Sequence, residues 1–359
     1  MFSAQTSSGR RSARASAAQP PTATVIETVG SSHGESARHH LREQFAADPA
    51  VAGRRGLQLC LAVMWLFDAA LQYQPFMFRP SFVTTVIVPA AAGNPGFVTT
   101  SVNWASHLML HQPAFFNAVF AAIQLLIAVG LFLRRTVKPA LALSIVWALS
   151  VWWFGESLGG ILVGMSPIAG VPGAALLYAL IAILIWPSAP KTTGQLPSVA
   201  TAGPIGATAA KLAWAALWGT FAHNSLLPSN SAAEAISETL SHTDGEPGWL
   251  AAIMSGLSRA ADHRGVDISV VLALLCVGIA LAMLAHQLVW PALVLAATLG
   301  IVFCFAQGLG GIFTGQGTDP GTGPLLILLT ACYLPRRTSQ AVDKSYRISP
   351  LAHPGHAPF

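Results

Sequence analysis

The sequence predicts an all-α, polytopic membrane protein with about eight transmembrane helices, built as two parallel four-helix repeats. Three observations lead to this prediction. Of the 359 residues, 53% are hydrophobic and only 9% are charged, whereas about a quarter of the residues of a soluble domain are charged. Several apolar runs approach the roughly 20 residues that a membrane-spanning helix needs. A sequence pattern also recurs in the second half of the chain at a nearly constant offset.

The predicted membrane helices form two groups of four. In the first half we expect them at residues 57–78, 114–133, 139–158 and 171–187. In the second half we expect them at residues 209–228, 266–285, 288–307 and 322–335. The runs at 171–187 and 209–228 are short or contain glycine, and the last run is the shortest of all. The two repeats therefore span residues 57–187 and 209–335.

The segments outside the repeats have a different composition. Residues 1–56 are rich in Ser, Ala, Arg and His and hold no long apolar run, which predicts a disordered cytoplasmic tail. Because the first apolar run begins only at Leu57, a cleavable signal peptide is not expected. The first helix then acts as an uncleaved anchor. Residues 188–208 are interpreted as a cytoplasmic linker, and residues 336–359 as a second cytoplasmic tail.

Charge predicts the orientation in the membrane. In the eight-helix arrangement, 16 of the 19 Lys and Arg residues fall on one side, and the other side holds only Arg79, Arg259 and Arg264. The positive-inside rule makes the first side cytoplasmic. The prediction is a multi-pass protein of the cell membrane with both termini in the cytoplasm. Anionic membrane lipids are sufficient partners for the net charge of +5, so no nucleic-acid partner is expected.

The repeat is seen most clearly in a glycine-rich motif. Residues 155–161 read Gly-Glu-Ser-Leu-Gly-Gly-Ile, and residues 306–312 read Ala-Gln-Gly-Leu-Gly-Gly-Ile, an offset of 151. At an offset of 153, Trp65, Ala69 and Pro75 match Trp218, Ala222 and Pro228. Near-constant offsets across a whole half predict a duplication. Since each unit has an even number of helices, both enter the membrane in the same direction and form parallel repeats.

Two carboxylates are the first candidates for chemistry, because they lie in or at the end of predicted helices. A charge near the bilayer centre costs about 2.5 to 3.5 kcal/mol on insertion scales, so such residues usually face a cavity or a partner. We interpret Asp68 and Glu156 as a catalytic pair that exchanges a proton, provided that they meet at the outer face. The alternative is that Asp68 is hydrogen-bonded to a neighbouring helix and that Glu156 is hydrated at the interface.

The repeat alignment suggests a single, asymmetric site. Asp68 aligns with Phe221 and Glu156 with Gln307, so the second unit has lost both carboxylates. It instead has a histidine and an asparagine where the first unit has alanine and leucine. The candidate cofactor-binding residues are therefore His223, Asn224 and Gln307. The alternative for the histidine is a hydrogen-bonded structural role.

A histidine pair before the second predicted helix is a candidate metal site. His107 and His111 are four residues apart, which is the spacing at which two imidazoles on one helix face share a metal. If the segment is a strand instead, Met109 joins them in a softer set suited to copper. The alternative is an interfacial histidine pair without a metal.

A family resemblance appears in the second and third predicted helices. Residues 124–136, Gln-Leu-Leu-Ile-Ala-Val-Gly-Leu-Phe-Leu-Arg-Arg-Thr, run into Ala-Leu-Ala-Leu at 140–143. This pattern resembles DoxX-like four-helix membrane proteins, a group that includes the small subunit of thiosulfate:quinone oxidoreductase. The resemblance implies a four-helix unit, a quinone as cofactor and a soluble or membrane redox partner. The sequence departs from the family at Gln124, where an acidic residue is often expected, and it lacks the thiol pair of the disulfide-handling relatives.

Three functions remain open from the sequence. The first is a redox-associated subunit that binds a quinone or a small sulfur compound in an outward-facing cavity. The second is a transporter or a copper-type metal-handling protein. The third is a membrane scaffold without catalysis.

Overall fold

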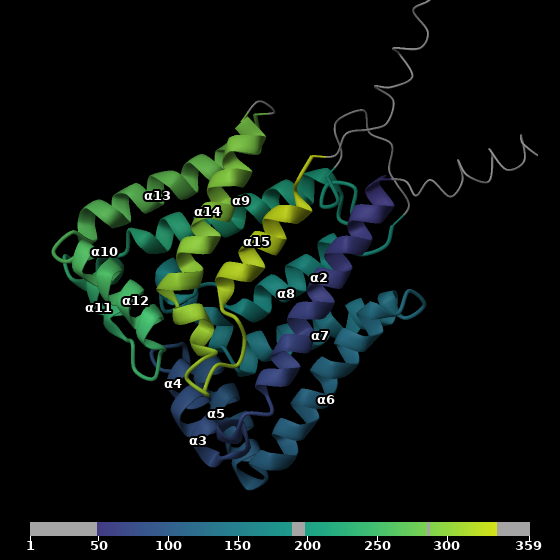
Figure 1. The fold of residues 1–359 in the computed structure, drawn as a ribbon, viewed down its shortest axis with the longest axis horizontal. Helices are drawn as coiled ribbons and strands as arrows, with labels where there is room; N and C mark the ends of the chain where they lie inside the picture. Colours follow the sequence, from purple (N-terminus) through teal and green to yellow (C-terminus); the bar gives the residue numbers. More distant parts are fainter. Residues whose placement is uncertain (1–48, 189–197, 286–287, 336–359) are drawn as a thin grey trace, which may run out of the picture. The chain divides into compact units, whose positions relative to one another are not determined.

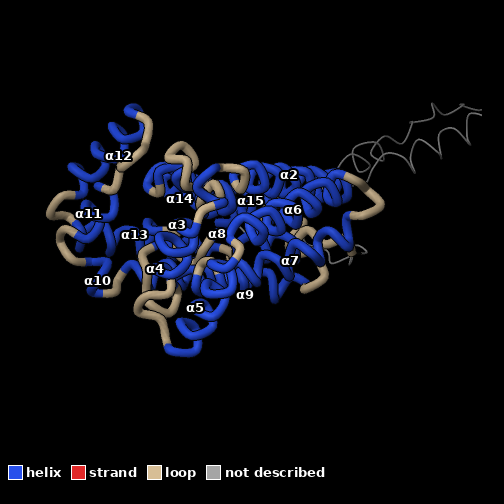
Figure 2. Tube along the Cα trace, turned by 90° about the horizontal axis from the view of Figure 1, so that it is seen from below, coloured by secondary structure: helices blue, strands red, loops and turns tan. Residues whose placement is uncertain are grey.

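The computed structural model describes residues 49–188, 198–285 and 288–335 (Figure 1). All regular structure in these ranges is helical, as predicted, and they hold no strand (Figure 2). Most of the predicted N-terminal tail, the middle of the predicted linker and the whole of the predicted C-terminal tail lie outside the described residues.

The first half contains four principal helices. They are α2 (Pro49–Leu71), α6 (Pro113–Phe132), α7 (Val137–Phe154) and α8 (Ala174–Leu184). Short helical segments connect α2 to α6, namely η1 (Pro75–Phe78), α3 (Pro80–Phe82), η2 (Val83–Ile87), α4 (Val88–Ala90) and α5 (Gly96–His111). Two 3-10 turns connect α7 to α8, namely η3 (Ser157–Gly160) and η4 (Pro167–Ala169).

The second half follows the same order. Its principal helices are α9 (Gly206–Ser225), α13 (Gly265–Ala282), α14 (Val289–Ala306) and α15 (Thr322–Cys332). The long connection after α9 contains α10 (Pro228–Ser231), α11 (Ala235–Ser241) and α12 (Gly248–Ala261). A 3-10 turn, η6 (Gly308–Gly311), follows α14.

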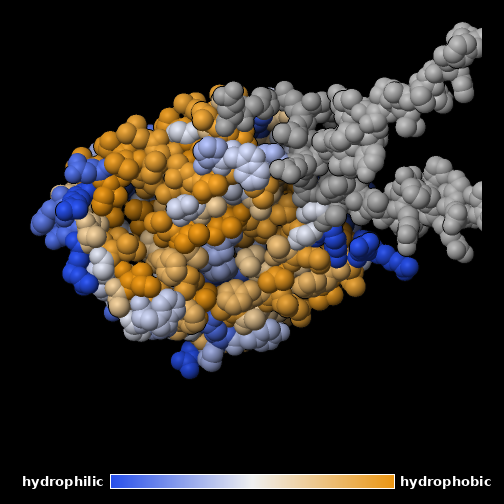
Figure 3. All heavy atoms as spheres, turned by 45° about the horizontal axis from the view of Figure 1, so that its top comes forward, coloured by the Kyte–Doolittle hydropathy of each residue, from blue (hydrophilic) through white to orange (hydrophobic). Residues whose placement is uncertain are grey.

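Among the described residues, four helices, α6, α7, α13 and α14, are long and apolar enough to cross a membrane. Each turns large apolar side chains outward, and Leu126, Val146, Leu274 and Val294 are all more than 60% exposed. Figure 3 shows hydrophobic groups covering much of one face, with hydrophilic groups toward its edges. Apolar surface of this extent is compatible with contact to lipid and with an integral membrane protein.

The structure corrects the predicted lengths of three segments. Helices α8 and α15 have only 11 residues each, or about 16 Å at 1.5 Å per residue, which is about half of a typical hydrocarbon core. Glycine-rich turns occupy the start of the run predicted at 171–187, and the run predicted at 322–335 ends early at Cys332. The first predicted helix ends at Leu71 rather than at residue 78, because Pro75 starts a separate 3-10 helix.

The two short helices lie at the centre of the packing. Helix α2 packs on α6 and α7 on α8, and in the second half α9 packs on α13 and α14 on α15. The two halves meet where α8 packs against α15 (Figure 1). In each of these short helices eight of the 11 residues are buried. They form the core around which the longer helices are arranged.

Hydrogen bonds define two ends of the bundle. At the first end, Arg55 donates to the carbonyl oxygens of Leu131 and Phe132, at 2.8 and 2.6 Å. At the other end, Asn117 Nδ2 donates to the carbonyl oxygen of Gln72, at 2.7 Å. Helices α2 and α6 are therefore antiparallel. We call the first end the tail end and the second, which carries the long connections after α2 and α9, the loop end.

A close approach between α14 and α15 provides a test of this packing. A Cβ atom added at Gly323 would lie 2.5 Å from the carbonyl oxygen of Gly300. We expect Gly323→Ala to destabilise the protein by about 1–3 kcal/mol, as overpacking does. Gly278→Ala in α13 is the matched control, because nothing lies within 4 Å of its added Cβ. Thermal unfolding in detergent measures both, and equal shifts for the two variants would contradict the close packing.

Candidate functional site

Side chains that follow the long helices cap the two short helices. Glu156 Oε1 accepts a hydrogen bond from the backbone N–H of Ala175 at 3.0 Å, at the start of α8. Gln307 Oε1 accepts from the N–H of Thr322 at 3.0 Å, at the start of α15. The first N–H groups of a helix have no partner within the helix, so a buried start needs such an acceptor. The two aligned positions thus have the same role, one with a carboxylate and one with an amide.

Matched left-handed turns bring these caps into place. Leu158 has φ of 63° and Leu309 has φ of 54°, a conformation that costs a residue with a side chain about 1–2 kcal/mol. Gly159 and Gly310 follow in the same region, with φ of 59° and 72°. A Cβ atom at Gly159 would overlap the backbone of Pro172. Glycine at this position therefore lets the turn pack against the loop that leads into α8.

Three carboxyl groups and one phenol gather at the loop end. Asp68 of α2 and Tyr178 of α8 are each only 2% exposed. Glu156 and Asp319, from the loops before α8 and α15, are half-buried. Asp68 interacts electrostatically with both of the other carboxyl groups, and Tyr178 with all three. Asp68 and Glu156 are therefore near enough to interact electrostatically, and their role as a catalytic pair stays a prediction. We call these four residues the acidic cluster.

Asp319 is the member of the cluster that sequence reasoning missed. It lies in a Thr-Asp-Pro-Gly turn, where an aspartate normally has a local role. It has that role here, since Oδ1 accepts from the N–H of Gly321 and Oδ2 from the hydroxyl of Thr318, both at 2.8 Å. Its proximity to Asp68 comes from the packing of the second half on the first, which no local pattern shows.

The electrostatics of the cluster favour bound protons. Burial, and secondarily the charge of Asp319, raises the pKa of Glu156 from 4.5 to about 8. Burial also raises the pKa of Asp319. Within the described ranges, no Lys or Arg forms an ion pair with any of the three carboxyl groups. Because like charges without a counter-ion are costly in a buried site, the cluster favours a partly protonated state.

Asp68 has incomplete hydrogen bonding. Its Oδ1 atom and the hydroxyl of Tyr178 are both buried, and neither makes a hydrogen bond of good geometry within the protein. The two groups nevertheless interact with each other electrostatically. This pair can take up a proton or accept a further polar group.

Asn224 and Gln307, both predicted to bind a cofactor, instead join the two halves. Asn224 Nδ2 donates to the carbonyl oxygen of Met165 at 2.9 Å, and Gln307 Nε2 donates to that of Pro167 at 3.3 Å. In the opposite direction, Gln74 Nε2 donates to the carbonyl oxygen of Gly317 at 3.2 Å. Each half therefore donates hydrogen bonds to a glycine-rich loop of the other half. These residues position the loops that carry Glu156 and Asp319.

The structure does not bring His223 to the acidic cluster. Its side chain is exposed on the last turn of α9, whereas the neighbouring Asn224 is buried. Successive residues of a helix point about 100° apart, so only one of the two can face the interior at this point. Here the asparagine takes the inward direction.

The histidine pair lies on α5, as the helical alternative predicted. The rings of His107 and His111 are 4.8 Å apart, and His111 Nδ1 lies 2.7 Å from the carbonyl oxygen of His107. Met109 points away and is buried, so the strand-like ligand set with copper is not formed. The described part of the chain holds no group of three or more His, Cys, Asp or Glu residues that could bind a metal. The pair therefore offers two ligands only.

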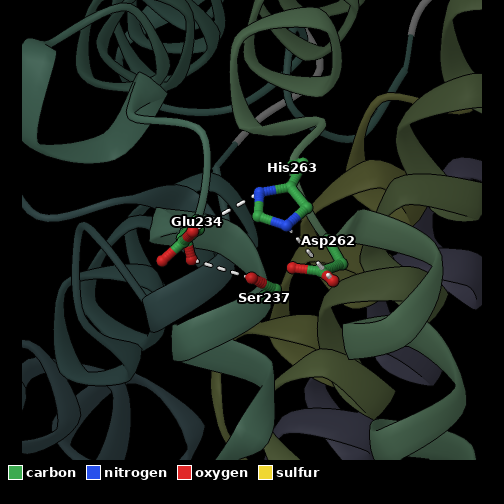
Figure 4. Close-up of polar contacts among 4 residues, drawn as sticks. All are labelled: Glu234, Ser237, Asp262 and His263. Atoms are coloured by element: carbon green, nitrogen blue, oxygen red, sulfur yellow. Dashed lines mark hydrogen bonds and ion pairs between the residues drawn. The ribbon is translucent and has the colours of Figure 1, made fainter.

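A second polar group lies on the surface of the loop end (Figure 4). His263 contacts Glu234 at 3.4 Å and Asp262 at 3.8 Å, and Ser237 Oγ donates to the carbonyl oxygen of Glu234 at 2.9 Å. All three ionisable side chains are more than half exposed, and exposed ion pairs contribute little to stability. The group ties the turn after α12 to the start of α11.

No family model, curated protein or solved structure matches the chain. The candidate site is therefore interpreted from its own residues, of which the acidic cluster is the most unusual chemically.

The cap of α8 leads to a testable pH dependence. We expect Glu156→Gln to keep the cap, because Gln307 makes the same bond with an amide oxygen. The folded wild type binds a proton at Glu156 more tightly than the unfolded chain does, so its stability is greatest below pH 4.5 and falls as the pH rises to about 8. The variant should lack the part of this decrease that comes from Glu156, so its decrease should be smaller than that of wild type; the raised pKa of Asp319 accounts for what is left.

Thermal unfolding in detergent across this pH range measures the effect. Glu156→Leu removes the acceptor and should destabilise the protein at every pH by about 1–2 kcal/mol. Glu238→Gln, on the exposed face of α11, is the matched control and should behave like wild type. If Glu156→Gln keeps the full pH dependence of wild type, the buried carboxyl group is not its source.

Proposed function

We propose that the chain is a multi-pass protein of the cell membrane, made of two parallel four-helix units with both termini in the cytoplasm. Three matched features support the duplication: the helix pairings in each half, the left-handed Leu-Gly turns, and the caps Glu156 and Gln307. In this arrangement the loop end faces outward. Each unit then has three long segments and one short, buried helix at the centre.

The function that the site supports best is a redox-associated membrane subunit of the DoxX-like kind. It binds a quinone or a small sulfur compound at the loop end, and the acidic cluster exchanges protons with it. The convergence of Asp68, Glu156 and Asp319 around Tyr178, without a basic partner, is the observation that carries this proposal. Ionisable groups placed at such cost within a membrane protein are usually functional.

The chemistry assigns separate roles to the residues. Reduction of a quinone to a quinol takes two electrons and two protons, and a redox partner supplies the electrons. Asp68 is the group that gives and takes a proton, since one of its oxygens has no partner. Glu156 and Asp319 are half-buried and interact electrostatically with Asp68, so they influence how tightly it holds its proton. Tyr178 interacts with all three carboxyl groups and orients the shared proton.

A transporter is the second candidate, and one observation favours it. Helices α8 and α15 are half-length helices that meet at the interface of the two halves, and α8 begins at a carboxylate. Broken helices of this kind form the ion and substrate sites of many transporters. A specifically metal-handling role has less support, because Met109 is turned away from the histidine pair. A scaffold without chemistry is the outcome if Asp68 proves dispensable.

The proposed orientation is tested with reporter fusions. A reporter fused after Arg135 or after Arg337 should be cytoplasmic, because the basic residues cluster on that side. A reporter inserted within residues 229–265 should lie outside. A cytoplasmic location for the insertion would contradict the parallel arrangement.

The role of Asp68 is tested by replacing its charge alone. Asp68→Asn keeps the shape of the side chain, so the protein should still accumulate in the membrane. We expect it to lose the pH-dependent carboxyl signal in infrared difference spectra, and quinone extracted from the purified protein should decrease. Asp267→Asn, at an exposed site on α13, is the matched control. A wild-type spectrum and quinone content for Asp68→Asn would favour the scaffold.

A further inference from the structure

Four buried side-chain oxygen atoms, carried by residues of α2 and α6, make no hydrogen bond of good geometry within the protein. They are Asp68 Oδ1, Gln72 Oε1, Asn117 Oδ1 and Gln124 Oε1. Their residues are between 1% and 6% exposed. Leaving such an acceptor unsatisfied costs about 1–3 kcal/mol. The amide oxygens are acceptors, and so is the carboxyl group of Asp68 when it is ionised, so the ligand that completes them is a hydrogen-bond donor.

The register of the two helices sets the order of these oxygens. Contacts of Arg55 with Leu131 and of Asn117 with Gln72 fix the antiparallel pairing at both ends. This register places Ala121 opposite Asp68 and Gln124 opposite Trp65. From the loop end inward, the order is therefore Gln72 with Asn117, then Asp68, then Gln124.

We call this row of oxygens the column. Its length indicates which kind of ligand can complete it. Asn117 and Gln124 are seven residues apart on α6, or about 10 Å along its axis. A bound metal ion touches ligands within about 2.5 Å, so a single ion cannot complete the whole set. A file of small donor molecules can do so. The buried side chain opposite Asp68 is the small Ala121.

The column is closed toward the tail end. Trp65 Nε1 donates to Ser144 Oγ at 2.9 Å, so this donor is already used. Below that level, Leu61, Ile127 and Leu131 are completely buried apolar side chains. At the opposite end, the interface reaches the half-buried Gln74, whose Oε1 atom also has no partner. The unpartnered oxygens therefore continue toward the loop end and are replaced by apolar side chains toward the tail end.

The second unit has no such column. On the proposed repeat alignment, Asp68 and Gln124 correspond to Phe221 and Cys276, both fully buried. Gln72 and Asn117 correspond to Ser225 and Ser269, whose hydroxyl groups donate to backbone carbonyl oxygens at 2.8 and 3.1 Å. At these matched helix positions, the unsatisfied acceptors thus occur only in the unit that holds Asp68. The helix arrangement that the two units have in common does not require these acceptors.

We propose that the α2–α6 interface binds a file of water molecules through which protons reach Asp68 from the loop end. This inference rests on the proposed function and specifies its route. Each water donates one hydrogen to a side-chain oxygen and the other to the next water in the file. A proton that enters at the loop end passes inward as each O–H bond forms and the next one breaks. The last transfer protonates the carboxylate of Asp68, and release follows the reverse path.

The test separates residues on the two sides of Asp68. In full-length protein in liposomes, the rate at which the Asp68 carboxyl signal follows a pH jump is measured by time-resolved infrared spectroscopy. Gln72→Leu removes an acceptor between the loop end and Asp68, and should slow the response about fivefold or more. Gln124→Leu makes the same change beyond Asp68 and should leave the rate within about twofold of wild type.

The outcomes distinguish this route from the proposed function itself. If the signal is not lost in Asp68→Asn, the proposed function fails. If that signal is lost but Gln72→Leu and Gln124→Leu respond equally, the water file is wrong and the proton-exchanging role of Asp68 stands. Should Gln72→Leu fail to accumulate, Ala121→Val is the second variant, because it fills the space opposite Asp68 and should also slow the response. A wild-type rate for Ala121→Val would then overturn the proposal.

Discussion

The fold depends on how two short helices begin inside the protein. Helices α8 and α15 start among buried residues, where water cannot satisfy their first N–H groups. The acceptors come from Glu156 and Gln307, at the ends of the long helices that precede them. For these side chains to reach back, the chain must reverse within a few residues. The left-handed Leu-Gly turns and the glycine-rich loops follow from that requirement.

The need for a cap on α8 also determines the electrostatics of the site, because the residue that provides the cap is a glutamate. An ionised carboxylate makes a stronger cap than an amide because it carries charge, but burial raises the pKa of Glu156 to about 8 and makes this cap a titratable group. In the first half this group lies near Asp68, and the packing of α15 on α8 adds Asp319 from the other half. Bound protons can then balance the cluster, since no described basic side chain pairs with it. Glu156 therefore has two roles: it caps helix α8, and it belongs to the acidic cluster.

The sequence predicted much of the helical frame. Long apolar runs identified the four membrane-compatible helices within a few residues, because hydropathy and length are local properties. It marked the runs at 171–187 and 322–335 as weak but still predicted them to be longer than the 11 residues of α8 and α15, since the glycines before them are apolar enough to extend a hydrophobic run. The helical ends at Leu71 and Ser225 were also placed too late. Prolines at 75 and 228 were assigned to the helices, although each begins a new segment.

The sequence predicted the members of the site only where the type of a single residue was informative by itself. Asp68 and Glu156 were identified because carboxylates are rare in apolar segments. Asp319 was missed because its local role as a turn residue hides its tertiary contact. His223 and Asn224 were treated alike, yet only the asparagine faces the interior. Which of two adjacent polar residues points inward depends on the position of the neighbouring helices, and that is not encoded in the local sequence.

The difference between the two units has a physical basis in their cores. In the second unit, Phe221 lies 5.2 Å from Trp218 and 6.0 Å from Phe303, in a fully buried aromatic group. On the proposed alignment, Asp68 stands where Phe221 does. Contacts between buried aromatic rings stabilise a core by about 0.5–1.5 kcal/mol each beyond the area they bury, whereas an unpaired carboxyl group destabilises one. Because the units pack together through α8 and α15, the stability of the second can offset the cost of Asp68 in the first. A duplication of this kind allows one copy to keep a costly group that a single unit would have to stabilise alone.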